Sequence, residues 1–122
     1  MTDFISNTEF GVDRRGSFLV VEVREERFAP DEIAGYRDPG CEAMRAQVRD
    51  AESPVVVDLS GVLFVSREAW MVIFQLYKIC TASNRAFAIC GLCDVALEQC
   101  TTAHLDRLFT VHSTLDVATA AA

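Results

Sequence analysis

The sequence has no excess of basic residues and no long apolar run. Of its 122 residues, 11 are Lys or Arg and 18 are Asp or Glu, so the formal net charge is −7. Binding to nucleic-acid phosphates or to anionic lipid needs a basic surface, so this balance argues against both functions. The longest uncharged apolar run, Ala69 to Tyr77, is far shorter than the roughly 20 residues of a membrane-spanning helix. The composition therefore predicts no nucleic-acid partner and no membrane span.

Features of export and of nucleotide binding are also missing. The first residues, Met-Thr-Asp-Phe-Ile-Ser, contain neither the basic nor the apolar segment of a signal peptide. Five cysteines without such a signal are expected to be reduced thiols in the cytoplasm. The six glycines are scattered, so no glycine-rich loop is available to hold phosphates, and we expect no cofactor. These absences favour one small cytoplasmic domain spanning residues 1–122.

The distribution of charge indicates where the core lies. Residues 1–52 hold 12 acidic and 7 basic side chains, whereas residues 53–122 hold 6 and 4. We therefore expect the second part to supply most of the core and the first part to cover it.

The apolar pattern predicts alternating strands and helices, which is typical of an α/β domain with partly parallel strands. A turn over residues 13–16 is expected to join the first two strands. One predicted helix places Cys41, Met44 and Val48 on a single face, and another is apolar on nearly every face and should be largely buried. The predicted strands cover residues 4–12, 17–23, 55–59, 86–90 and 109–112. Four helices are predicted: one begins at Pro39, one covers about 66–83, one covers 94–102, and the last follows an N-cap at Ser113 or Thr114.

Two segments resemble one family. The strand and loop over residues 55–65, Val-Val-Val-Asp-Leu-Ser-Gly-Val-Leu-Phe-Val, are similar to the signature of STAS domains, the anti-sigma-factor antagonist family. The closing segment over residues 105–115, Leu-Asp-Arg-Leu-Phe-Thr-Val-His-Ser-Thr-Leu, resembles the end of the same family. The resemblance implies a single STAS-like domain with a four- or five-stranded mixed sheet and about four helices.

The family resemblance also implies a function through protein partners rather than through catalysis. In the best-known members, an anti-sigma factor that is also a serine kinase phosphorylates a serine at the start of the helix that follows the signature strand. The unphosphorylated form binds the kinase and frees the sigma factor. The usual sequence there is Asp-Ser-Ser-Gly, with the second serine as acceptor. A partner of this kind, or a component of a stressosome-like assembly, is therefore expected, and a homodimer remains open.

This chain departs from the family pattern at the phosphorylated position. The four positions are Ser66, Arg67, Glu68 and Ala69, so the phosphoacceptor position holds Glu68, which has no hydroxyl. Its carboxylate carries about one negative charge against roughly −1.5 to −2 for phosphoserine. Glu68 either imitates the phosphorylated state or has only a local structural role, since an acidic side chain in the first turn of a helix is favourable. Ser66, just before this helix, is a residue type that commonly forms the N-cap.

We predict that the partner-binding surface lies at the loop and the helix start near residues 60–70. Exposed side chains at a rigid strand-to-helix junction are a common binding surface. The predicted contact residues are Ser60, Gly61, Ser66, Arg67, Glu68 and Ala69. An alternative function is a non-switching STAS scaffold, or a ligand-binding subunit of a stress-signalling or lipid-transport complex.

The cysteines allow two further interpretations. Cys90 and Cys93 form a Cys-x-x-Cys sequence between a strand and a helix, as in thioredoxin-like redox proteins. All three prolines precede this sequence, however, so the cis-proline that thioredoxin-like domains place after it is missing. Together with Cys100 and His104, the same cysteines have the ligand types of a zinc site. Buried cysteines commonly behave as small apolar side chains, so we expect neither a metal site nor an enzyme.

Overall fold

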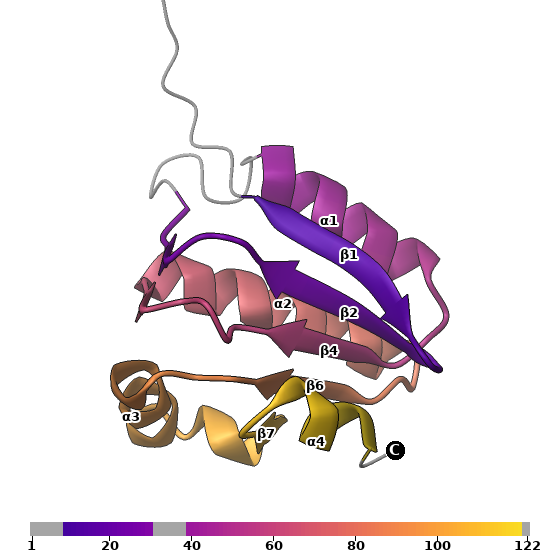
Figure 1. Cartoon of the computed structure of the whole chain (residues 1–122). Helices are drawn as coiled ribbons and strands as arrows, with labels where there is room; N and C mark the ends of the chain where they lie inside the picture. Colours follow the sequence, from indigo (N-terminus) through magenta and orange to yellow (C-terminus); the bar gives the residue numbers. More distant parts are fainter. Residues whose placement is uncertain (1–8, 31–38, 121–122) are drawn as a thin grey trace, which may run out of the picture.

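Helices lie on both faces of a five-stranded mixed sheet (Figure 1). The computed structural model describes residues 9–30 and 39–120. Residues 4–8 of the first predicted strand, and Asp38 before the first predicted helix, lie outside these ranges. The elements are β1 (Phe10–Arg15), β2 (Phe18–Val23), β3 (Arg27–Phe28), α1 (Pro39–Asp50), β4 (Val55–Asp58), β5 (Phe64–Val65), α2 (Arg67–Ala82), β6 (Phe87–Cys90), α3 (Asp94–Thr102), a 3₁₀ turn (Leu105–Arg107), β7 (Thr110–His112) and α4 (Leu115–Ala120).

The strand order in the sheet is β1-β2-β4-β6-β7. β1 and β2 form an antiparallel hairpin, and the pairs β2–β4, β4–β6 and β6–β7 are all parallel. A parallel neighbour requires a long crossover, and α1, α2 and α3 provide the three crossovers. The predicted α/β fold, with a four- or five-stranded mixed sheet and about four helices, is confirmed, since the described residues form five strands in the main sheet and four α-helices.

β4 is the central strand, and it is apolar because both faces of the sheet are covered there. Val55 and Val57 belong to the larger core, and Val56 belongs to a smaller core on the other face. All three have at most 1% of their surface exposed. Such a strand has no polar face, which explains its uninterrupted run of valines.

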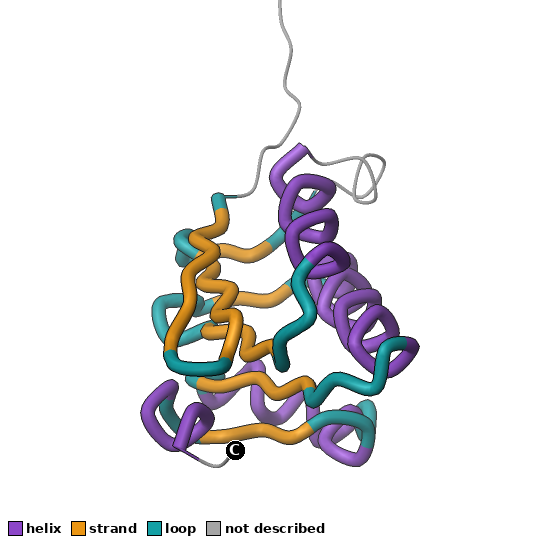
Figure 2. The backbone as a smooth tube through the Cα atoms, turned by 90° about the vertical axis from the view of Figure 1, so that its right-hand side faces the viewer, coloured by secondary structure: helices purple, strands orange, loops and turns teal. Residues whose placement is uncertain are grey.

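The two cores differ in size because the helices are unequally divided between the faces. α1 and α2 run side by side across one face, and the short α4 lies against the other (Figures 1 and 2). The predicted face of α1 is confirmed, since Cys41, Met44 and Val48 are all buried in the larger core. The smaller core contains Phe18, Val20, Val56, Cys90 and Ala118.

Two predictions of local structure need correction, and one strand pair was missed. β1 continues through Arg15, so the turn expected over 13–16 is confined to Gly16 and the residue after it. The short parallel pair of β3 with β5 was not predicted. α2 is not buried on nearly every face, because Met71 is 42% exposed and Phe74 is 38% exposed. Because apolar residues are spread over the whole circumference of α2, the sequence shows no helical periodicity that would identify its exposed face.

Candidate functional site

A tight turn follows β4 and begins the candidate site. Asp58 is buried, and its carboxylate oxygen Oδ1 accepts hydrogen bonds from the backbone N–H of Ser60 at 3.0 Å and from the Ser60 hydroxyl. The Cys90 thiol lies 3.7 Å from the same oxygen and donates to it. These bonds fix the turn, and they leave Ser60 and Gly61 exposed at its tip.

The loop after β6 packs directly against this turn. Gly91 has a φ of +75°, in the left-handed region, and a Cβ there would lie 2.4 Å from Ser60 Oγ and 2.8 Å from Ser60 Cα. A side chain at this position would therefore collide with backbone atoms of the turn. The adjacent backbone bond from the Leu59 N–H to the Cys90 carbonyl, at 2.9 Å, holds the two segments together. The position of Ser60 thus depends on a glycine that is 31 residues further along the chain.

Two apolar side chains are exposed between the turn and α2. Leu63 is 64% exposed and Phe64 is 37% exposed. The Arg27 guanidinium lies over the Phe64 ring, 4.1 Å from its centroid. Backbone bonds from Leu63 and Phe64 to the Glu26 carbonyl, at 2.7 and 3.1 Å, hold this segment in place. Sequence reasoning missed both side chains as surface residues, because they stand inside a continuous apolar run with no polar residue to mark the exposed side.

The predicted contact residues at the start of α2 lie at very different depths. Ser66 caps the helix, because its hydroxyl oxygen accepts the Ala69 N–H at 3.0 Å. Arg67 has 80% of its side chain exposed and Glu68 only 21%, with 3.7 Å between Arg67 Nε and Glu68 Oε2. Ala69 is fully buried, at 0% exposed. Ala69 therefore packs in the core, and it is removed from the proposed contact set.

The turn at Ser60 and the start of α2 belong to one exposed surface with Leu63 and Phe64. We call the set Ser60, Gly61, Leu63, Phe64, Arg67 and Glu68 the junction surface. Its chemistry is mixed, because it contains two exposed apolar side chains, a cation and a partly buried carboxylate. Such a surface is suited to contact with another protein.

The described residues do not support the two cysteine interpretations. All five cysteines are free, and no group of three or more His, Cys, Asp or Glu in the described ranges could hold a metal ion. Burial, together with the charge of Asp58 and its hydrogen bond, raises the pKa of the Cys90 thiol to about 12. A redox-active thiol needs a lowered pKa, so the environment of Cys90 acts in the opposite direction.

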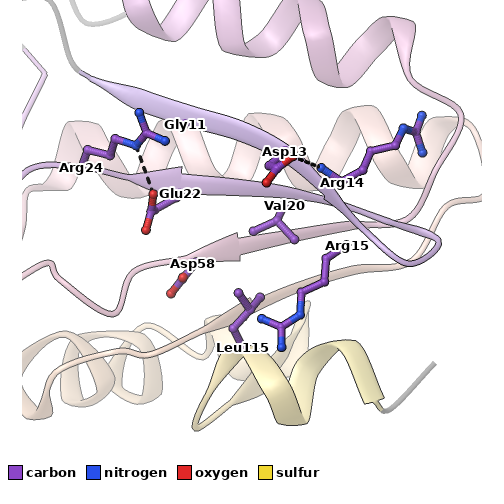
Figure 3. A pocket seen from close by; sticks show the side chains of 9 residues that line it. All are labelled: Gly11, Asp13, Arg14, Arg15, Val20, Glu22, Arg24, Asp58 and Leu115. Carbon is purple, nitrogen blue, oxygen red and sulfur yellow. Dashed lines mark hydrogen bonds and ion pairs between the residues drawn. The ribbon is translucent and has the colours of Figure 1, made fainter.

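A small hollow of about 230 Å³ lies on the part of the sheet that α4 leaves uncovered (Figure 3). Its charged side chains come mainly from β1 and β2. Glu22 and Arg24 form an ion pair at 3.1 Å, and Arg15 pairs with Asp116 on α4. Because the opposite charges within each pair neutralise each other, the hollow favours neither an anionic nor a cationic ligand.

Comparison with known proteins identifies the family. The sequence profile of the STAS domain matches residues 13–118, which is most of the chain. The chain belongs to the STAS domain family. This confirms the resemblance carried by residues 55–65 and 105–115. No curated protein sequence matches this STAS domain significantly. No helix in the described part of the chain is long and apolar enough to cross a membrane.

Solved structures agree with the STAS fold. An anti-sigma-factor antagonist (STAS) domain protein from Planctomyces limnophilus has a TM-score of 0.77 and 19% identity, and the match covers 92% of this chain and 96% of that one. An anti-sigma factor antagonist from Mycobacterium paratuberculosis has a TM-score of 0.77 and 22% identity, with 94% and 93% covered. A serine-to-glutamate variant of RsbS from Moorella thermoacetica has a TM-score of 0.68 and 14% identity, with 89% and 90% covered. At these identities the likeness shows the fold.

Proposed function

We propose that this STAS domain is a protein-binding regulatory module of the anti-sigma-factor antagonist type, and that it binds its partner through the junction surface. The observation that carries the proposal is the exposure of Leu63, at 64%, beside Phe64 and Arg67. Aromatic side chains and arginine are both enriched at protein interfaces, and this surface contains Phe64 and Arg67, with Leu63 adding exposed apolar area. The family membership and the antagonist names of its structural neighbours support the same function.

The second part of the proposal concerns switching. Glu68 stands at the position where the family pattern has its phosphoacceptor serine, and a carboxylate cannot be phosphorylated by a serine kinase. Ser66, two residues earlier, is engaged as the N-cap of α2. We therefore propose a module whose partner binding is not controlled by phosphate at position 68. This feature also favours the alternative, a non-switching STAS scaffold in a stress-signalling assembly.

The experiment begins with a partner and ends with a set of variants. A pull-down from the source cytoplasm supplies candidate proteins, and each is then produced in pure form for titration by calorimetry. An anti-sigma factor of the serine-kinase type among the direct binders indicates the antagonist function, and a subunit of a stress-signalling scaffold indicates the alternative. Arg67→Ala should weaken binding about tenfold, as expected for a central interface residue, and Leu63→Ala should weaken it about tenfold because it removes apolar area that the partner would cover. Val117→Ala is the matched apolar control, because Val117 is 48% exposed on α4, against the opposite face of the sheet.

Glu68→Ser gives information on the role of the carboxylate. Tighter binding means that Glu68 imitates phosphate and holds the module in its weak-binding state, and weaker binding means that the carboxylate is itself a contact. Glu52→Ser is the charge control, because Glu52 is exposed before β4, at the opposite end of that strand from the junction surface. If the Leu63, Arg67 and Glu68 variants all bind like the wild type, the proposed surface is wrong.

A further inference from the structure

A groove of about 510 Å³ runs along the outward side of α2. Trp70, Met71, Phe74 and Leu105 supply its apolar lining, with Arg67 toward one end and Lys78 toward the other. Arg67, Met71, Phe74 and Lys78 are spaced i, i+4, i+7 and i+11, so they form one stripe along the helix. Met71 and Phe74 are 42% and 38% exposed, so the middle of the stripe presents apolar surface to solvent.

The charges around this groove are opposite to the charge of the protein. A neighbouring hollow of about 340 Å³ shares Lys78 and is lined by Arg45 and Arg49 as well. The two hollows together hold four of the chain's 11 basic residues, and among the residues that the structure describes no acidic one lines either hollow. Glu68, which lies 3.7 Å from Arg67, is an acidic neighbour at one end. The charged side chains that line these two hollows are thus all basic, on a chain with a net charge of −7.

This charge pattern argues against a second copy of the chain as the occupant. In a two-fold dimer through the groove, the same basic surface would face itself, and like charges placed together are unfavourable. A contact between the groove and a different, acidic surface of a second copy would be heterologous, so it would build rings or open chains rather than the common two-fold dimer.

We propose that the groove binds an acidic amphipathic helix of a regulatory protein partner. Apolar side chains of that helix would pack on Met71, Phe74 and Trp70, and its carboxylates would face Arg67 and Lys78. A helix laid in an apolar groove is a common mode of peptide recognition, with anchors at i, i+3 or i+4, and i+7. The 11 residue-to-residue steps from Arg67 to Lys78 span about 16 Å at 1.5 Å per step, which matches about three turns of a partner helix.

This inference rests on the proposed function, because it describes the chemistry of the partner of the same module. The groove begins at Arg67, which is also part of the junction surface. A partner held at the junction surface therefore has a continuous path along α2. The junction surface and the groove are separable by mutation, since Leu63 lies only in the first and Met71 and Lys78 only in the second.

The test is a selection with a defined probe. A displayed library of 16-residue helix-favouring peptides, with every position varied, is selected on the full chain and counter-selected on Met71→Asp. The recovered peptides should be rich in Asp and Glu, with apolar residues at i, i+3 or i+4, and i+7. Synthetic copies should bind the wild type at least tenfold more tightly than Met71→Asp or Lys78→Glu, and raised salt should weaken binding because the charges are solvent-exposed. Val117→Asp on α4 and Arg24→Glu immediately after β2 are the surface controls, and circular dichroism verifies that each variant is folded.

Several outcomes would overturn the inference. Recovered peptides without an acidic excess, or peptides that bind Lys78→Glu as tightly as the wild type, would show that charge does not select the occupant. A concentration-dependent dimer that Met71→Asp dissociates would make the occupant a second copy. A chain without residues 1–8 that binds the peptides more than tenfold better would make the occupant the chain's own segment.

The two proposals fail in different ways. If the natural partner loses affinity for Leu63→Ala but binds Met71→Asp and Lys78→Glu normally, the junction surface stands and the groove proposal is wrong. If the acidic peptides bind as expected and the partner is insensitive to Leu63→Ala and Glu68→Ser, the proposed junction surface is wrong and the groove stands.

Discussion

Gly91 offers a direct test of how the turn at Ser60 is held. Replacing it by alanine adds a Cβ that would lie 2.4 Å from Ser60 Oγ and 2.8 Å from Ser60 Cα and N. It also places a side chain on a residue with a φ of +75°. The first effect is a collision with backbone, and the second is the cost of the left-handed conformation. The two effects can be separated because the chain contains glycines that have only one of them, or neither.

Gly16 and Gly61 are the matched controls. Gly16 has a φ of +64° and nothing within 4 Å of an added Cβ, so Gly16→Ala measures the conformational cost, about 1–2 kcal/mol. Gly61 has open space and no left-handed φ, so Gly61→Ala should be neutral or slightly stabilising. Gly91→Ala should add an overpacking cost of about 1–3 kcal/mol to the conformational cost, giving a total of about 2–5 kcal/mol.

Urea unfolding followed by circular dichroism measures all three variants against the wild type. The expected order of stability is Gly61→Ala, then Gly16→Ala, then Gly91→Ala. Partner affinity should fall for Gly91→Ala but not for Gly16→Ala, because only Gly91→Ala displaces the Ser60 turn, which is part of the junction surface. Equal losses of stability for Gly16→Ala and Gly91→Ala would refute the reasoning, since they would show that the turn moves away from the added methyl group at no cost.

Three further predictions concern the helix cap and the thiols. Ser66→Ala should lower the free energy of unfolding by about 1 kcal/mol, because the Ala69 N–H loses its acceptor, and an unchanged melting temperature would contradict this. Iodoacetamide should label Cys93 first in the folded protein, since the other four thiols are buried. Peptide mass spectrometry identifies the first labelled site, and labelling of any other cysteine before Cys93 would contradict this prediction. Burial and Asp58 raise the pKa of Cys90 from 9.0 to about 12, so its contribution to stability is full below pH 9 and is lost as the pH rises toward 12. Cys90→Ala should reduce this alkaline loss, and an identical pH profile would count against the shift.

Elements with strong local signals could be predicted from the sequence. α3 covers Asp94–Thr102 as predicted, and α2 differs from its predicted range by one residue at each end. Ser66 was recognisable as a cap because a hydroxyl before an apolar helix has a defined local role. β4 was recognisable because three valines follow Pro54 and lead directly into the signature loop. In each case the information lies within a few residues of the element itself.

Features that depend on distant contacts could not be predicted. β3 and β5 have two residues each, and they pair only because the fold brings residues 27–28 beside residues 64–65. The exposure of Leu63 and Phe64 follows from that pairing, so the apolar half of the junction surface had no signal in the sequence. The role of Gly91 depends on its contact with Ser60, and the burial of Ala69 depends on how α2 packs on the sheet.

The outer strands of the sheet have a consequence for behaviour at high concentration. Among the described residues, β1 and β7 are the two outermost strands, and each has one row of backbone groups without a neighbouring strand. β7 has only three residues, and β1 ends in the charged sequence Asp13-Arg14-Arg15. Short outer strands and charged outer strands are two devices that discourage aggregation through added strands. Self-assembly by strand addition is thus disfavoured at both margins, and association is directed to the side-chain surfaces of α2 and the junction.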